Sequence, residues 1–220
     1  MKPTKLFLFV LIIAAALSIE GCAPKGDIWS VDFTDYLNDD LSDWNDQIYL
    51  SPAGYLHDAT GLYFDSHVLT APYGFNGDFT LTLTFSLDTG KDDVILNMEV
   101  GFTDGAFTPG DLSTEEYLNL ELINMGDPDM EFWKLTDDGY ILDDGREIPG
   151  LNRTEGNILV IEKRGNRVEV TMNGTPVGQM DYEDCQLDYF VPDIYLNTSA
   201  GKQIRLKNIS VQYEGDKQPR

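Results

Sequence analysis

From Trp29 onward, apolar residues recur at every second position rather than at every third or fourth. In residues 79–87 five apolar side chains alternate with four hydroxyl side chains, and residues 94–102 and 117–123 alternate in the same way. A period of two turns one side of the segment toward a core and the other toward solvent, as in an antiparallel strand. We therefore expect strands here, with Met98, Leu120 and Leu122 in the core.

Shorter apolar runs between turn signals predict further strands. They lie near 28–33, 47–50, 61–65, 129–136, 157–163, 167–172 and 191–197. Four dipeptides carry the glycine or asparagine that tight hairpin turns require. These are Asp138-Gly139, Asp144-Gly145, Gly165-Asn166 and Asn173-Gly174.

The last strand changes phase along its length. Ile204 and Leu206 follow one alternation, whereas Ile209 and Val211 follow the other. A β-bulge at Lys207-Asn208 would return the second pair to the core face. About a dozen strands without a linker or an internal repeat predict one all-β domain, folded as a two-sheet antiparallel jelly-roll sandwich.

The N-terminal residues predict export and a lipid anchor. Leu6–Leu17 is an uncharged apolar run of 12 residues behind Lys2 and Lys5. That length fits a signal peptide and is too short to span about 30 Å of hydrocarbon. The Ile19-Glu20-Gly21-Cys22 segment resembles a bacterial lipobox, in which the cysteine receives the lipid. The alternative is a signal peptide cut elsewhere, with Cys22 incidental.

We therefore expect an exported protein, anchored to a membrane of the cell envelope or surface through a lipid on Cys22. The expected organisation is a lipoprotein signal peptide at 1–21, a tether at 22–27, the jelly-roll domain at 28–215 and a polar tail at 216–220.

Composition narrows the possible partners. The chain has 38 Asp and Glu against 15 Lys and Arg, for a formal net charge of −23. A nucleic acid is excluded as a partner, because its phosphates are bound by basic residues and repelled by acidic ones. With 2 cysteines the chain is no disulfide scaffold, and with 2 histidines a His-built zinc site is disfavoured.

The hairpin chemistry of the second half, together with Asp32-Phe33 and the later Leu41-Ser42-Asp43-Trp44, resembles a known superfamily. Over nearly all of residues 29–214 the pattern is similar to the concanavalin A-like lectin/glucanase jelly roll. Laminin G-like domains and bacterial 3-keto-disaccharide hydrolase-like domains are the nearest types. The resemblance implies two antiparallel sheets of six or seven strands, one of them concave, with a glycan bound or cleaved on the concave face.

We expect such a glycan site on the polar sides of the strands at 94–102, 117–123 and 129–136. Alternation turns a set of amide and carboxylate side chains away from the core, and these groups bind sugar hydroxyls: Asn97, Glu99, Asn119 and Glu121. Trp133 offers a ring that could stack on a sugar, with core packing as the alternative interpretation. Polar residues face outward on any half-buried strand, so a plain solvated face is also consistent with the pattern.

The sequence assigns no catalytic residue. The Glu-x-Asp-x-Glu strand motif of laminarinase-type relatives is missing. Glu99 and Glu121 are the best pair for a glycosidase, which needs two carboxylates about 5 Å apart for retention or about 6.5–9.5 Å apart for inversion. The sequence thus favours a non-catalytic, glycan-binding, lipid-anchored envelope protein. An exported glycoside hydrolase or related sugar-active enzyme is one alternative, and a structural envelope protein is another.

A cluster of aspartates could form a calcium-binding site. It comprises Asp32, Asp35, Asp39, Asp40, Asp43 and Asp46. Calcium takes six to eight oxygen ligands, and the resembled fold often carries a structural calcium ion. Aspartate is also a turn former, so a solvated acidic surface is the competing interpretation. No metal-ligand set is assigned.

Overall fold

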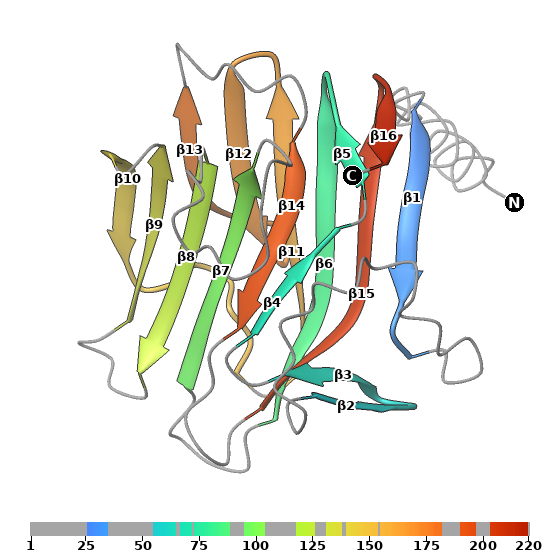
Figure 1. Cartoon of the computed structure of the whole chain (residues 1–220). Coiled ribbons are helices and arrows are strands. Elements are labelled where there is room, and N and C mark those ends of the chain that lie inside the picture. The colour runs from blue at the N-terminus through green and yellow to red at the C-terminus, as the bar shows by residue number, and fades with distance from the viewer. Residues whose placement is uncertain are drawn as a thin grey trace, which may run out of the picture.

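Two antiparallel β-sheets face each other across an apolar core in a computed structural model of the chain (Figure 1). The structure describes residues 26–34, 55–64, 67–71, 73–88, 95–103, 118–125, 131–137, 140–153, 155–181, 190–196 and 203–219. Within these residues the all-β, two-sheet antiparallel prediction is confirmed, because every sheet pairing is antiparallel.

The larger sheet has eight strands among the described residues. Its order is β13 (Thr175–Asp181), β12 (Arg167–Met172), β11 (Gly156–Arg164), β6 (Phe79–Asp88), β15 (Gln203–Tyr213), β3 (Gly61–Phe64) and β2 (Tyr55–Asp58). β1 (Asp27–Asp32) pairs with β15 as well, on the side of β15 away from β6 (Figure 1).

The second sheet has six strands, and a small third sheet has two. The six-stranded order is β10 (Tyr140–Arg146), β9 (Glu131–Asp137), β8 (Leu118–Met125), β7 (Ile95–Thr103), β14 (Val191–Leu196) and β4 (His67–Thr70). The third sheet pairs β5 (Tyr73–Phe75) with β16 (Lys217–Pro219).

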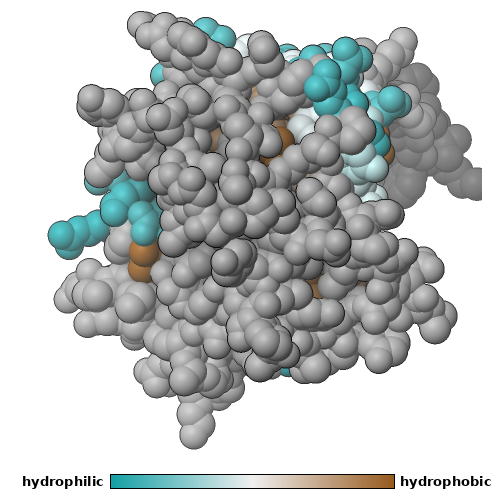
Figure 2. Space-filling model, viewed as in Figure 1, coloured by the Kyte–Doolittle hydropathy of each residue, from teal (hydrophilic) through white to brown (hydrophobic). Residues whose placement is uncertain are grey.

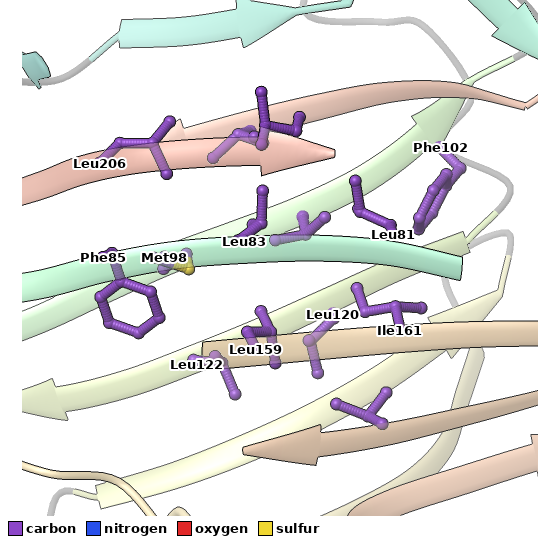
Figure 3. Close-up of a cluster of buried hydrophobic side chains, with 14 of the residues drawn as sticks. Leu81, Leu83, Phe85, Met98, Phe102, Leu120, Leu122, Leu159, Ile161 and Leu206 are labelled. Atoms are coloured by element: carbon purple, nitrogen blue, oxygen red, sulfur yellow. The ribbon is translucent and has the colours of Figure 1, made fainter. Parts of the chain in front are cut away.

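The core fills the space between the two large sheets. On the face seen in Figure 2, the described residues are mainly hydrophilic, with small apolar areas between them. Inside, β6 contributes Leu81, Leu83 and Phe85, each 0% exposed, and Figure 3 shows them among Met98 and Leu122 of the six-stranded sheet. Each such side chain contributes about 1.5–3 kcal/mol by leaving water. The predicted inward positions of β7 and β8 are confirmed, because Met98, Leu120 and Leu122 are at most 1% exposed.

The predicted bulge in the last strand is confirmed. Pairing with β6 passes from Leu206 to Asn208 and skips Lys207. The Lys207 carbonyl instead accepts a hydrogen bond from Phe33 N at 2.8 Å, and Asn208 Nδ2 donates to Val31 O at 3.0 Å. β15 thereby pairs with β3 before the bulge and with β1 after it, while Ile209 returns to the core.

The predicted turns have different outcomes. Gly165-Asn166 and Asn173-Gly174 join β11 to β12 and β12 to β13, with positive φ at Gly165 (53°), Asn173 (52°) and Gly174 (76°). The turn predicted at Asp144-Gly145 is wrong, because both residues lie inside β10 and pair with β9. Asp138-Gly139 lies between the paired ends of β9 and β10 but outside the described residues.

The domain extends beyond both predicted boundaries. Asp27, expected in the tether, begins β1, and Lys217–Pro219, expected in a polar tail, forms β16 against β5. Residues 1–25, with the predicted signal peptide and Cys22, lie outside the described residues, as does the strand expected at 47–50. No helix in the described ranges is long and apolar enough to cross a membrane.

Candidate functional site

A row of charged residues crosses the polar side of the six-stranded sheet. Antiparallel pairing sets Glu99 of β7 directly opposite Glu121 of β8, and Glu121 opposite Lys134 of β9. Lys134 is in turn opposite Asp144 of β10. Directly opposed residues have Cβ atoms about 4.5–5.5 Å apart, so neighbouring members of this row can interact.

Specific contacts hold the centre of the row. Lys134 Nζ lies 3.4 Å from Glu121 Oε2 and forms an ion pair with it. A side-chain hydrogen bond joins Glu99 to Asn119, which lies two residues before Glu121 on β8. The Glu121 and Lys134 side chains are 25% and 33% exposed, so both remain accessible to a ligand while their orientation is restrained.

The electrostatics of Glu99 are distinctive. Partial burial raises the pKa of its carboxyl above the usual glutamate value, and the neighbouring Glu121 carboxylate raises the pKa further. The hydrogen bond to Asn119 opposes this pKa shift by stabilising the charged form. Glu99 therefore takes up a proton at a higher pH than an ordinary glutamate does.

The other predicted polar residue of β7 is Asn97. It belongs to β7 two residues before Glu99 and pairs with Ile123 of β8, while Asn119 pairs with Gly101 and Thr136. The Asn97 side chain lies outside the described part of the structure. The described site is therefore Glu99, Asn119 and Glu121, joined by Lys134.

Trp133 is not part of this face. It pairs with Leu122, is 6% exposed and belongs to the core. The core-packing interpretation of Trp133 is therefore confirmed, and its assignment to the glycan-binding face beside Glu121 is wrong. Its indole fits between Gly145 of β10 and Gly178 of β13, where a Cβ on either glycine would overlap the ring. This packing also explains why Asp144-Gly145 continues a strand instead of turning.

A buried carboxylate on β9 breaks the alternation of apolar inward and polar outward residues in this strand. Glu131 is 4% exposed and shares the inward side with Trp133. Glu131 Oε1 accepts a hydrogen bond from Ile148 N at 2.7 Å, and its other oxygen forms an ion pair with Arg153. Glu131 thus anchors the connection from β10 to β11. Neither this role of Glu131 nor that of Lys134 was expected from the sequence; Lys134 follows Trp133 by one residue, so an inward Trp133 would have turned Lys134 outward.

A second pair of opposed glutamates provides an internal comparison. On the outer side of the eight-stranded sheet, Glu162 of β11 faces Glu169 of β12. Each has its own arginine: Arg164 Nη2 lies 2.9 Å from Glu162 Oε1, and Arg167 Nε lies 2.6 Å from Glu169 Oε1. Their side chains are 44% and 51% exposed, so this pair is more solvated than Glu121.

The described residues do not assemble a metal site. No group of three or more His, Cys, Asp or Glu residues gathers among them. Asp32 Oδ1 accepts hydrogen bonds from Thr34 N and Oγ1 at 2.9 and 2.7 Å, which gives it a turn-forming role. The other five aspartates of the predicted calcium cluster lie outside the described residues, so a calcium site stays a prediction.

Solved structures of several sugar-binding proteins share this architecture. The carbohydrate recognition domain of Emp46p, in a metal-free form, aligns with a TM-score of 0.60 at 10% identity, covering 86% of this chain and 97% of that one. The fold is the two-sheet jelly roll of these domains. A legume lectin-like domain from Entamoeba histolytica aligns with a TM-score of 0.55 at 15% identity, covering 74% of this chain and 87% of that one.

A third structure is the exoplasmic/lumenal domain of VIP36 bound to Ca²⁺ and Man3GlcNAc. It aligns with this chain with a TM-score of 0.53 at 10% identity, covering 72% of this chain and 80% of that one. No protein-family model matches the sequence, and no curated protein matches it. At these identities the likeness extends to the fold alone, and the narrower resemblance to laminin G-like domains stays a prediction.

Proposed function

We propose that this protein is a lipid-anchored cell-envelope protein whose concanavalin A-like domain binds a glycan without cleaving it. The binding site is the outer side of the six-stranded sheet, at Glu99, Asn119, Glu121 and Lys134, with Asn97 at its margin. The observation that carries the proposal is the half-buried polar row, which combines carboxylate acceptors with an amide and an ammonium donor.

The chemistry of this row fits sugar hydroxyls. Hydroxyl groups donate and accept, so adjacent acceptors and donors on a rigid sheet can bind two hydroxyls of one ring. The strands fix the positions of these groups before the ligand arrives, which lowers the entropic cost of binding. The glycan-bound VIP36 structure adds support by analogy, because a domain of the same fold binds Man3GlcNAc.

A glycan array probed with the mature domain tests the proposal. We expect the domain to bind at least one class of glycan on the array. The array should be repeated with Glu121→Ala and with Glu169→Ala, which removes a carboxylate from the opposite sheet. Loss of signal for the first variant alone supports the proposed face. An array without any hit would favour the structural envelope role instead.

A glycoside hydrolase is the second candidate, and the unequal surroundings of Glu99 and Glu121 favour it. A retaining glycosidase needs one carboxyl that holds a proton and a nearby carboxylate that stays charged. Burial raises the pKa of Glu99, as the acid would require, whereas Glu121 pairs with Lys134. Release of sugar from a polysaccharide, abolished by Glu99→Gln while binding persists, would replace the non-catalytic proposal with this one.

A further inference from the structure

The edge of the sandwich next to the predicted anchor carries an unusual combination of apolar and aromatic residues. Ile28 of β1 is 67% exposed, one of two large hydrophobic side chains that are exposed among the described residues. Its neighbour Trp29 projects to the other side of β1, where it is partly buried against the core and contacts Tyr73 of β5, with ring centroids 6.1 Å apart. Lys217 of β16 places Nζ 4.2 Å from the centre of the Tyr73 ring. We call these four residues the N-terminal edge.

The length of the preceding chain places this edge close to Cys22. Ile28 follows Cys22 by six positions along the chain, and a fully extended chain covers at most about 3.6 Å per residue. Ile28 therefore stays within roughly 22 Å of Cys22 in any conformation of the tether. A lipid on Cys22 would keep the edge at a high effective concentration beside the bilayer.

We propose that the N-terminal edge rests on the surface of the bilayer that holds the acylated Cys22. This inference rests on the lipid anchor of the proposed function. Ile28 gains free energy by leaving water, and tryptophan and tyrosine favour the boundary between the headgroups and the hydrocarbon. Lys217 is exposed, and its ammonium carries the charge that a lipid phosphate attracts.

The charges around the edge determine which lipids suit it. Asp27 is exposed at the start of β1, and Glu214 and Asp216 are exposed just before Lys217 in the chain. Hydrophilic residues gather at the top right of Figure 2, where β5 and β16 lie in Figure 1. Acidic side chains are repelled by anionic headgroups. The edge therefore contacts zwitterionic lipid, and anionic lipid weakens the contact.

This orientation turns part of the proposed glycan site away from the membrane. From β1 the large sheet continues through β15, β6, β11 and β12 to β13. Neighbouring strands are about 4.8 Å apart, which places β13 roughly 24 Å farther from the bilayer than β1. Trp133 packs against Gly178 of β13, so β9 and Lys134 lie toward this outer edge.

Fluorescence quenching on vesicles tests the contact. The chain from Cys22, with Cys185→Ser, is joined through Cys22 to a maleimide phospholipid in phosphatidylcholine vesicles with brominated acyl chains. The variant Trp44→Phe/Trp133→Phe retains Trp29, and Trp29→Phe/Trp44→Phe retains Trp133 as a matched control. We expect bromine to reduce the emission of Trp29 and to leave that of Trp133 unchanged, with less quenching of Trp29 when anionic lipid is added.

A second comparison avoids any change in the core. In the chain that keeps all its tryptophans, Ile28→Ser should reduce the quenching, whereas Ile158→Ser, at the other exposed hydrophobic residue, should not. Unquenched Trp29, or equal effects of the two serine variants, would overturn the proposed contact. The chemical link supplies the anchor here, so cellular protein without lipid on Cys22 would overturn the anchor separately, and with it the contact in the cell.

Discussion

Glu99 lies directly opposite Glu121 across two antiparallel strands, and Glu121 forms an ion pair with Lys134 at 3.4 Å. Two carboxylates at directly opposed positions repel each other when both are charged. The repulsion and the partial burial of Glu99 together raise the pKa of its carboxyl. Repulsion between the two carboxylates lowers the free energy of unfolding at neutral pH. Residues with perturbed pKa values are common in sites that act on a ligand.

The first prediction is the pH dependence of stability. A folded-state pKa above the unfolded value means that Glu99 contributes fully at low pH and loses that contribution as pH rises through the folded-state pKa. Glu99→Gln should therefore increase the free energy of unfolding near pH 7 by about 0.2–1 kcal/mol and have less effect near pH 4. Urea unfolding at the two pH values measures this. Glu162→Gln serves as control, and a Glu99 variant less stable than wild type at neutral pH would refute the argument.

The second prediction concerns the packing of Trp133. A Cβ at Gly145 would overlap the indole, so Gly145→Ala should destabilise the domain by about 1–3 kcal/mol. The loss should shrink when Trp133→Leu is also present, because the overlapping ring is then gone. Gly156→Ala is the control, since its added Cβ would lie 3.9 Å from the nearest atom. Additive effects of the two changes at 133 and 145 in denaturant unfolding would argue against this packing.

Most of the fold could be predicted from sequence patterns within single strands and turns. The alternation of β6, the Asn173-Gly174 turn and the phase change at Lys207 each depend on residues close together in sequence, and the structure confirms all three. Register between strands distant in sequence is set by packing of the whole core. The sequence therefore could not show that Gln203–Tyr213 pairs with Phe79–Asp88.

The candidate site was only partly predictable, because alternation is a local signal and interstrand register is not. Alternation within β7 and β8 identified Glu99 and Glu121, whose strands show unbroken patterns. Alternation gave the wrong side for Trp133. Glu131 is a charged residue at an inward position of β9, so the polar and apolar residues of this strand do not mark its two sides. The pairing of Glu121 with Lys134 depends on interstrand register and became visible only in the fold.

The third prediction concerns calcium. If the aspartates between Asp32 and Asp46 bind the ion, calcium at 100 times its Kd should add about 2.7 kcal/mol to the free energy of unfolding. The melting temperature should then be higher in millimolar calcium than in chelator. An unchanged melting temperature would leave these aspartates as turn and surface residues.

The fourth prediction concerns Cys22. Protein extracted from membranes should have an intact mass equal to the chain from Cys22 plus lipid. Cys22→Ala should release the protein from the membrane fraction, because the lipid on Cys22 supplies the attachment that keeps the N-terminal edge beside the bilayer. Membrane association that persists in Cys22→Ala, or a free N-terminus elsewhere, would contradict the anchor.

The most direct test of the central claim is calorimetric titration of the strongest array ligand into wild type, Glu121→Ala and Glu169→Ala. If the outer side of the six-stranded sheet binds the glycan, Glu121→Ala weakens binding by about 1–3 kcal/mol, because polar partners lose a hydrogen bond. Glu169→Ala, on the opposite sheet, leaves the affinity unchanged, and both variants melt close to wild type. An affinity for Glu121→Ala equal to that of wild type would contradict the assignment of this face.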